Sequence, residues 1–157
     1  MIKYSRLTKE QFEEMQEEFI NFLAAQSITG KEWDEIKRVK PEVAEEELDV
    51  FSDLIWEGVL NNASYLENIS AQQLFLFKVE ESFMKLIVIK TTNKKIDFTT
   101  VEGYQWLQKN FAFEEVAFFT ANKDFTGKKN EDIFSLIQQG AIITKGSLFG
   151  FFNDIVN

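Results

Sequence analysis

The sequence predicts an α+β fold, in which N-terminal helices precede a small, mostly antiparallel sheet that packs with further helices. Apolar residues recur at helical spacing over most of residues 9–60, the period changes to two over residues 73–90, and helical spacing returns near the C-terminus. No internal repeat, low-complexity run or linker interrupts this order. We therefore expect one globular domain over residues 1–157, a length that can bury a core of its own.

The first sixty residues predict three helices. A capping box at Thr8 begins a helix over about residues 9–26, and a second at Thr29 begins a short helix. Pro41, the only proline, ends the short helix and suits the first turn of a third helix over residues 41–60.

The third helix has an apolar stripe that covers about half of its circumference, so we expect it to be central. The stripe consists of Val43, Val50, Phe51, Leu54, Ile55, Gly58 and Val59. Trp56 and Leu60 project from the opposite, acidic side, near Asp49 and Asp53.

The remaining residues predict the sheet and the helices that cover it. Period-two patterns predict a hairpin near 73–90, and the compact apolar run EVAFFTA predicts a strand near 115–121. Thr99 and Glu102 form a capping-box pair before a helix. The chain then predicts a helix over 131–139, a short strand at AIIT and a core helix over 147–156.

The chain contains neither histidine nor cysteine, which excludes many classes of site. Imidazole is the usual general base near neutral pH and the commonest metal ligand, and thiolate supplies covalent nucleophiles and zinc sites. Serine and threonine have no imidazole to activate them, and no catalytic or phosphate-binding motif occurs. We expect no catalytic residue, no metal and no cofactor, and favour a protein that is not an enzyme.

Charge and hydropathy indicate the compartment and limit the partners. The net charge is −9, and residues 1–60 carry 15 acidic against 7 basic side chains, which disfavours nucleic acid as a partner. The charged N-terminus has no signal-peptide core, and no apolar run is long enough to span a membrane. Together with the lack of cysteine, these features predict a cytoplasmic protein that has no membrane partner.

Two tryptophans lie off the apolar stripes of their predicted helices and are candidates for binding a partner protein. Trp56 and Leu60 would form the centre of one such site, with Asp49 and Asp53 at its rim, and Trp106 is a further candidate. The alternative is that another helix of the same domain covers Trp56 and Leu60.

Glu47 is a candidate perturbed acid, because the helical spacing places it among apolar residues of the third helix. The alternative is a structural role, in which its carboxylate reaches solvent or an unpaired amide.

The segment LTKEQFEEMQEEFINFLAAQSITGKEWDEIKRVKPEVAEEELDVFSDLIWEGVL, together with TTVEGYQWL and QQGAIITKGSLF, resembles an uncharacterised family of small proteins from Bacteroidota. The resemblance covers nearly the whole chain. It implies a bacterial cytoplasmic protein from a domain-of-unknown-function family that has no assigned activity or catalytic residues.

Three functions remain open. The leading hypothesis is a non-enzymatic cytosolic adaptor that contacts another protein, in an oligomeric state that the sequence does not define. The first alternative is a small-molecule-binding regulatory domain, because 17 phenylalanines could line an apolar pocket. The second alternative is a carboxylate-dependent hydrolase, which would need two inward-facing acids in one cleft.

Overall fold

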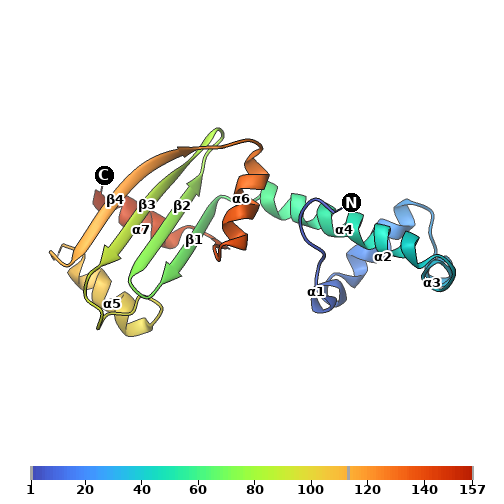
Figure 1. Cartoon of the computed structure of the whole chain (residues 1–157), viewed down its shortest axis with the longest axis horizontal. Coiled ribbons are helices and arrows are strands. Elements are labelled where there is room, and N and C mark those ends of the chain that lie inside the picture. The colour runs from blue at the N-terminus through green and yellow to red at the C-terminus, as the bar shows by residue number, and fades with distance from the viewer. Residues whose placement is uncertain (1, 113, 157) are drawn as a thin grey trace. The chain divides into compact units, whose positions relative to one another are not determined.

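A computed structural model describes residues 2–112 and 114–156 and confirms the α+β prediction, with helices preceding an antiparallel sheet (Figure 1). The described residues form seven helices and five strands. They fall into two compact units, residues 1–61 and residues 62–157. The expectation of one domain over the whole chain stays a prediction.

The first unit, residues 1–61, consists of helices. These are α1 (Lys9–Glu14), α2 (Gln16–Ala25), α3 (Gly30–Val39) and α4 (Pro41–Asn61). Thr8 forms the predicted capping box with Gln11 at the start of α1, and the Thr29 hydroxyl accepts the Glu32 N–H at the start of α3.

The prediction of a single helix over residues 9–26 is wrong, because Met15 divides this region into α1 and α2. Met15 has a φ of −109° and a ψ of 26°, outside the helical range, and its N–H is shared between the carbonyls of Gln11 and Phe12. Rings on both sides of the break meet Phe51 of α4, at centroid distances of 6.0 Å for Phe12 and 5.0 Å for Phe19. The break therefore accompanies the convergence of α1 and α2 on one buried ring.

Helix α4 does not bury its whole predicted stripe. Phe51 is fully buried, but Val50 and Leu54 are 57% and 58% exposed. The buried arc instead includes Ala44 and Ser52. The prediction that α4 is buried along its whole stripe is therefore wrong at Val50 and Leu54. The rings of α1 and α2 pack instead on Phe51, the residue that follows Val50.

The second unit, residues 62–157, is built on a five-stranded antiparallel sheet in the order β4-β3-β2-β1-β5. Its strands are β1 (Tyr65–Ser70), β2 (Gln73–Val79), β3 (Phe83–Thr91), β4 (Val116–Asp124) and β5 (Ile142–Thr144). The predicted hairpin and the strand near 115–121 are present as β2, β3 and β4. Strand β1 was not predicted, because its residues YLENIS have only a weak alternation.

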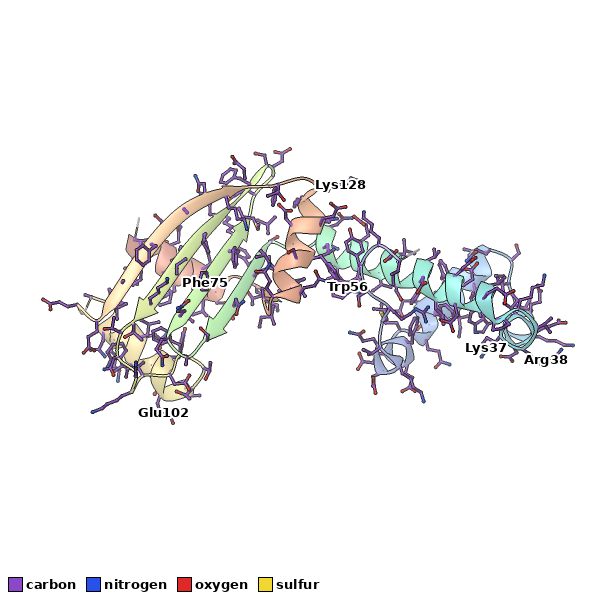
Figure 2. The ribbon with its side chains drawn as sticks, viewed as in Figure 1. Lys37, Arg38, Trp56, Phe75, Glu102 and Lys128 are labelled. Carbon is purple, nitrogen blue, oxygen red and sulfur yellow. The ribbon has the colours of Figure 1, made fainter. Side chains whose placement is uncertain are left out.

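Three helices complete this unit: α5 (Val101–Asn110), α6 (Lys129–Gln138) and α7 (Ser147–Val156). Figure 2 marks Glu102 on α5 and Lys128 just before α6. The N-cap of α5 is Thr100, whose hydroxyl accepts the Gly103 N–H, and not Thr99 as predicted. Thr99 instead donates its hydroxyl and its N–H to the Asp97 carboxylate in the preceding turn.

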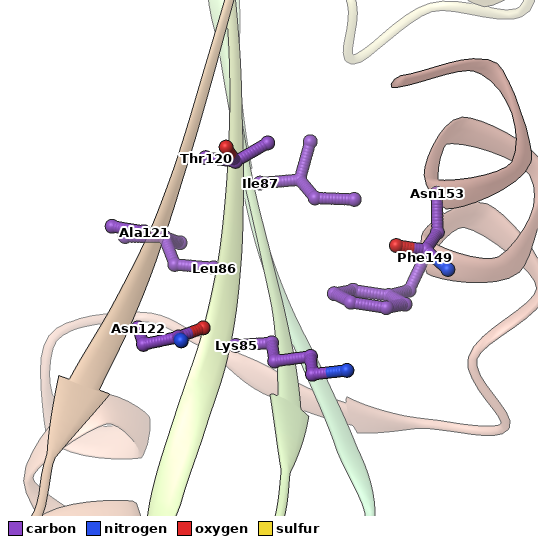
Figure 3. A pocket seen from close by; sticks show the side chains of 8 residues that line it. All are labelled: Lys85, Leu86, Ile87, Thr120, Ala121, Asn122, Phe149 and Asn153. Carbon is purple, nitrogen blue, oxygen red and sulfur yellow. The ribbon is translucent and has the colours of Figure 1, made fainter. Parts of the chain in front are cut away.

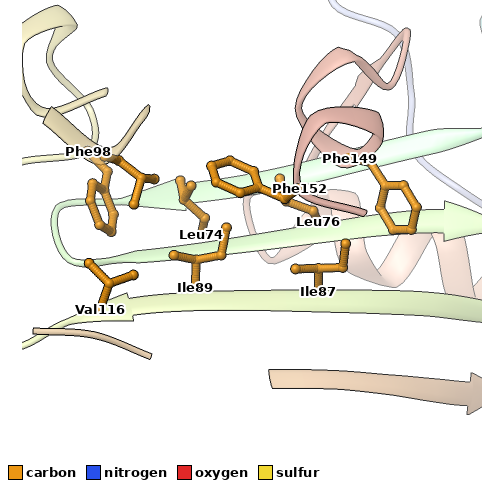
Figure 4. Packing of buried hydrophobic residues seen from close by; sticks show 9 residues of the cluster. Leu74, Leu76, Ile87, Ile89, Phe98, Val116, Phe149 and Phe152 are labelled. Atoms are coloured by element: carbon orange, nitrogen blue, oxygen red, sulfur yellow. The ribbon is translucent and has the colours of Figure 1, made fainter. Parts of the chain in front are cut away.

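The core of this unit lies between one face of the sheet and helices α5 and α7 (Figure 4). Leu74 and Leu76 of β2 and Ile87 and Ile89 of β3 form its strand side, and all four are at most 2% exposed. The helix side includes Leu107 of α5 and Phe149 and Phe152 of α7. Because residues i and i+2 of a strand share a face, this inner face also carries Thr120 and Asn122 of β4, opposite Ile87 and Lys85.

Candidate interaction surfaces and a polar pocket

Helix α4 carries four acids at a spacing of four residues, which places them along one face: Glu45, Asp49, Asp53 and Glu57. We call this set the acid ladder. The N-terminal segment Lys3–Leu7 lies against it. The Asp53 carboxylate accepts the backbone N–H groups of Lys3 and Tyr4 at 2.7 and 2.9 Å. The ladder therefore holds a segment of the chain's own backbone.

The side chains of the same segment reinforce this contact. The Arg6 guanidinium donates to Asp49 at 2.6 Å and pairs with Glu45 at 2.8 Å. The hydrogen bond with Asp49 raises the pKa of Arg6 further above its usual value. The Tyr4 hydroxyl donates to Glu57 at 2.7 Å. Sequence reasoning missed Glu57, although the spacing of four from Asp53 was available as a signal.

The predicted partner-binding residues do not form one exposed surface. Asp49 and Asp53 bind the N-terminal segment. Leu60 is fully buried, so it cannot be the exposed centre of a partner site. Trp56, labelled on α4 in Figure 2, is half-buried and its indole nitrogen is shielded from solvent. Trp106 is half-buried and packs against the core of the second unit.

Glu47 is half-buried and accepts a hydrogen bond from the Gln26 side-chain amide at 2.9 Å. This contact ties α4 to the end of α2 and corresponds to the structural alternative. Another carboxyl group is perturbed by its surroundings. Glu67 of β1 lies on the inner face of the sheet, opposite Leu76, and burial raises the pKa of its carboxyl group. Glu67 was not predicted as a candidate, because the polar pattern of β1 does not identify it as a strand.

The two edges of the sheet differ in length and chemistry. Strand β5 has three residues, whereas β4 has nine, and β4 pairs only with β3 among the described residues. Proteins commonly protect a sheet edge by keeping the edge strand short or by placing charges and prolines on it. The first six residues of β4, VAFFTA, carry no charge and no proline. The first six residues of the β4 edge are therefore unprotected, whereas Lys123 and Asp124 place charges at its end.

The outer face of the sheet, opposite the core, carries apolar residues up to this edge. The pairing register places Phe75, Val88 and Phe119 in one row across β2, β3 and β4. Phe119 at the edge is 54% exposed, whereas Phe75 is half-buried and Val88 between them is buried. Figure 2 labels Phe75 on β2. The Lys90 ammonium lies 5.8 Å from the centre of the Phe119 ring.

A polar pocket of about 490 Å³ opens on the inner face, between the sheet and α7 (Figure 3). Lys85, Thr120 and Asn122 line it from the strands, and Asn153 lines it from α7. Phe149 and Ile87 supply its apolar lining. One ammonium, one hydroxyl and two amides thus lie around a single hollow, and no acid is among its described lining residues.

The carboxylates give no comparable arrangement. Within residues 2–112 and 114–156, no group of three or more Asp and Glu side chains lies close enough to hold a metal ion. Glu32 and Glu35 share a hollow of about 230 Å³ on α3, but both are exposed and the Glu32 carboxylate accepts the Thr29 hydroxyl. Among the helices of the described chain, none combines the length and the apolar character that crossing a membrane requires.

The fold and these surfaces define a small α+β protein that has a long free sheet edge, an apolar outer face beside it and one polar pocket. The chain belongs to the DUF6495 family, a family of unknown function that matches it over residues 1–157. No curated protein and no solved structure matches the chain.

Proposed function

We propose that this protein is a non-enzymatic interaction protein, and that it binds its protein partner through the β4 edge and the adjoining outer face of the sheet. The observation that carries the proposal is Phe119, an aromatic side chain that is 54% exposed on a nine-residue edge strand. An exposed edge offers unpaired N–H and C=O groups to an incoming strand, and Phe119 offers it an exposed apolar side chain at that edge.

This site replaces the one predicted around Trp56. Leu60 is buried, and the N-terminal segment occupies the acids at the proposed rim. We also propose a cytoplasmic location, which the absence of cysteine supports, and no binding to nucleic acid, which the net charge of −9 supports.

The test is co-purification of a partner from the native cell. Phe119→Glu places a charge at the centre of the proposed surface, where the side chain is exposed, so the fold should be retained while the partner is lost. Ile142→Glu is the matched control, because Ile142 is an apolar residue that is 59% exposed on the opposite edge strand, β5. Equal recovery of a partner by both variants would refute the site.

A second candidate function is the binding of a small anionic metabolite in the polar pocket. The specific observation is the convergence of Lys85, Thr120, Asn122 and Asn153 around one hollow that lacks an acid among its described lining residues. A thermal-shift titration with inorganic phosphate and citrate tests it. A rise in melting temperature that Lys85→Ala abolishes and Lys78→Ala preserves would support the site, and no rise with either anion would count against it.

A further inference from the structure

We propose that the polar pocket is the specificity pocket of the β4 edge, and that it takes an acidic side chain of the strand that the partner adds there. The inference rests on the proposed function and adds the chemistry of the partner, an extended segment that carries a glutamate or an aspartate. The pocket and the edge share residues, because Thr120 and Asn122 belong to β4 and also line the hollow (Figure 3). In binding by strand addition, main-chain hydrogen bonds supply affinity and pockets for alternate side chains supply specificity.

The backbone of β4 presents these two pocket residues to an incoming strand. The Thr92 N–H donates to the Glu115 carbonyl, and these residues continue the register of β3 with β4 by one step. Because hydrogen-bonded pairs alternate along an antiparallel ladder, the odd-numbered residues of β4 bond to β3. The even-numbered residues, Thr120 and Asn122 among them, therefore direct their N–H and C=O groups to the free edge.

The same two residues direct their side chains to the inner face, where the pocket lies. Residues that lie directly opposite each other in neighbouring strands share a face of the sheet, so a partner residue opposite Asn122 would extend its side chain beside the pocket. Asn122 lies opposite Lys85 of β3, which completes a row of three residues across three strands. The outer members of this row are two strand spacings apart, about 9.6 Å, which a lysine and a glutamate side chain can span together.

Charge selects an acid for the partner residue in this row. Lys85 lines the pocket, and no acid is among the pocket's described lining residues. Lys78, the next residue of the row on β2, pairs with Glu80 at 3.4 Å, whereas Lys85 forms no ion pair with an acid of the described residues. Strands β3 and β4 together carry three lysines and one aspartate, in a chain whose net charge is −9. The sheet is therefore basic beside its free edge, which complements an acidic segment.

The outer face adds a second requirement. Side chains alternate between the two faces along a strand, so partner residues opposite odd-numbered positions of β4 lie on the outer face. The partner residue opposite Phe119 would meet a ring that is 54% exposed, which favours an apolar side chain. In an antiparallel strand, the acid opposite Asn122 precedes this apolar residue by three positions. The expected recognition pattern is therefore an acid, two further residues and an apolar residue.

Panning a phage-displayed library of random peptides against the full chain tests this pattern. We expect the peptides that bind the wild-type chain to be enriched in it. Lys85→Ala should remove the preference for an acid and keep the preference for an apolar residue, because Lys85 is exposed and the fold does not depend on it. Lys78→Ala is the matched control and should keep both preferences, since Glu80 already pairs with Lys78. Binding peptides without an acid preference, or no binding peptide at all, would overturn the inference.

Fluorescence anisotropy with one selected peptide measures the contact itself. Replacing the acid of the peptide, Glu by Gln, should raise the dissociation constant for the wild-type chain about tenfold, as expected for the loss of a charge-assisted hydrogen bond, and should change it little for Lys85→Ala. Equal losses for both proteins would overturn the inference, because the acid would then bind elsewhere. Peptide binding that Phe119→Glu abolishes but that is indifferent to the acid would also overturn it and would leave the proposed function standing. A pocket that binds inorganic phosphate or citrate, without an acid preference among the peptides, would instead support the small-molecule candidate.

Discussion

The two compact units are stabilised in different ways. In residues 1–61, polar side chains of α4 hold the backbone of the N-terminal segment: Asp53 accepts two N–H groups and buried Ser52 accepts a third, from Leu7. In residues 62–157, the strands supply the backbone hydrogen bonds and the side chains mainly fill an apolar core. The first unit therefore combines a small apolar core with individual hydrogen bonds to its N-terminal segment, whereas the second depends mainly on packed volume.

The largest effect is expected in the core of the second unit. Phe152 of α7 is fully buried and its ring centre lies 6.0 Å from that of Phe118. Phe152→Ala should lower the free energy of unfolding by about 3–5 kcal/mol, because it leaves a cavity. Urea denaturation measures the change. Phe151→Ala is the control, since Phe151 is 39% exposed on the same helix and should cost far less. Similar losses for both would refute the packed-core description.

A smaller loss is expected where α5 approaches the preceding turn. A Cβ atom at Gly103 would collide with the Asp97 carbonyl, which is backbone and cannot rotate away. Gly103→Ala should therefore lower the free energy of unfolding by about 1–3 kcal/mol. In α7, a Cβ atom at Gly150 would meet nothing within 4 Å, so Gly150→Ala should stabilise by about 0.5–1 kcal/mol. Thermal unfolding of the two variants should show shifts of opposite sign.

In the first unit, the comparison can be tested at Ser52. Its hydroxyl accepts the Leu7 N–H at 3.1 Å and donates to the Leu48 carbonyl at 2.8 Å. Ser52→Ala removes almost no volume but leaves a buried N–H without its acceptor, which should cost about 1–3 kcal/mol. Faster hydrogen exchange of the Leu7 amide, measured by NMR, should accompany the loss. An unchanged exchange rate would show that this bond does not hold the segment.

The smallest effect concerns pH. Burial raises the pKa of Glu67 above its ordinary value, so the folded chain binds the proton more tightly than the unfolded chain. The ionised group therefore opposes folding, and its contribution becomes less favourable as pH rises from the ordinary pKa of Glu through the raised one. Glu67→Gln should stabilise the protein near pH 7 and give no advantage below about pH 4. Urea denaturation at both pH values provides the check.

The sequence predicted much of the fold, because local patterns determine most of its elements. Capping residues and hydrophobic periodicity identified the starts of α1 and α3, the β2–β3 hairpin and α7. Strand β1 was missed because Glu67, Asn68 and Ser70 give it a polar pattern, and its strand character depends on pairing with β2. The break at Met15 involves neither Gly nor Pro and depends on the tertiary packing of Phe12 and Phe19 on Phe51.

The candidate sites were harder to predict for a related reason. Asp49 and Asp53 were identified as a polar rim, but the segment that binds them lies more than 40 residues earlier in the chain. Strand β4 was predicted, but its position at the edge follows from the order of all five strands. The pocket combines Lys85, Thr120 and Asn153 from three elements that no local motif relates.

The spacing of acids along α4 is similar to the spacing of the residues that bind them in the N-terminal segment. Four residues of an α-helix advance about 6.0 Å, and two residues of a chain can advance up to about 6.6 Å. Moving from Asp53 to Asp49 on α4 corresponds to moving from Tyr4 to Arg6 in the segment, which runs antiparallel to the helix. Inserting one residue between Tyr4 and Arg6 would lengthen this stretch by up to about 3.3 Å and shift Arg6 away from Asp49. The spacing of residues within the segment is therefore as constrained as their identity.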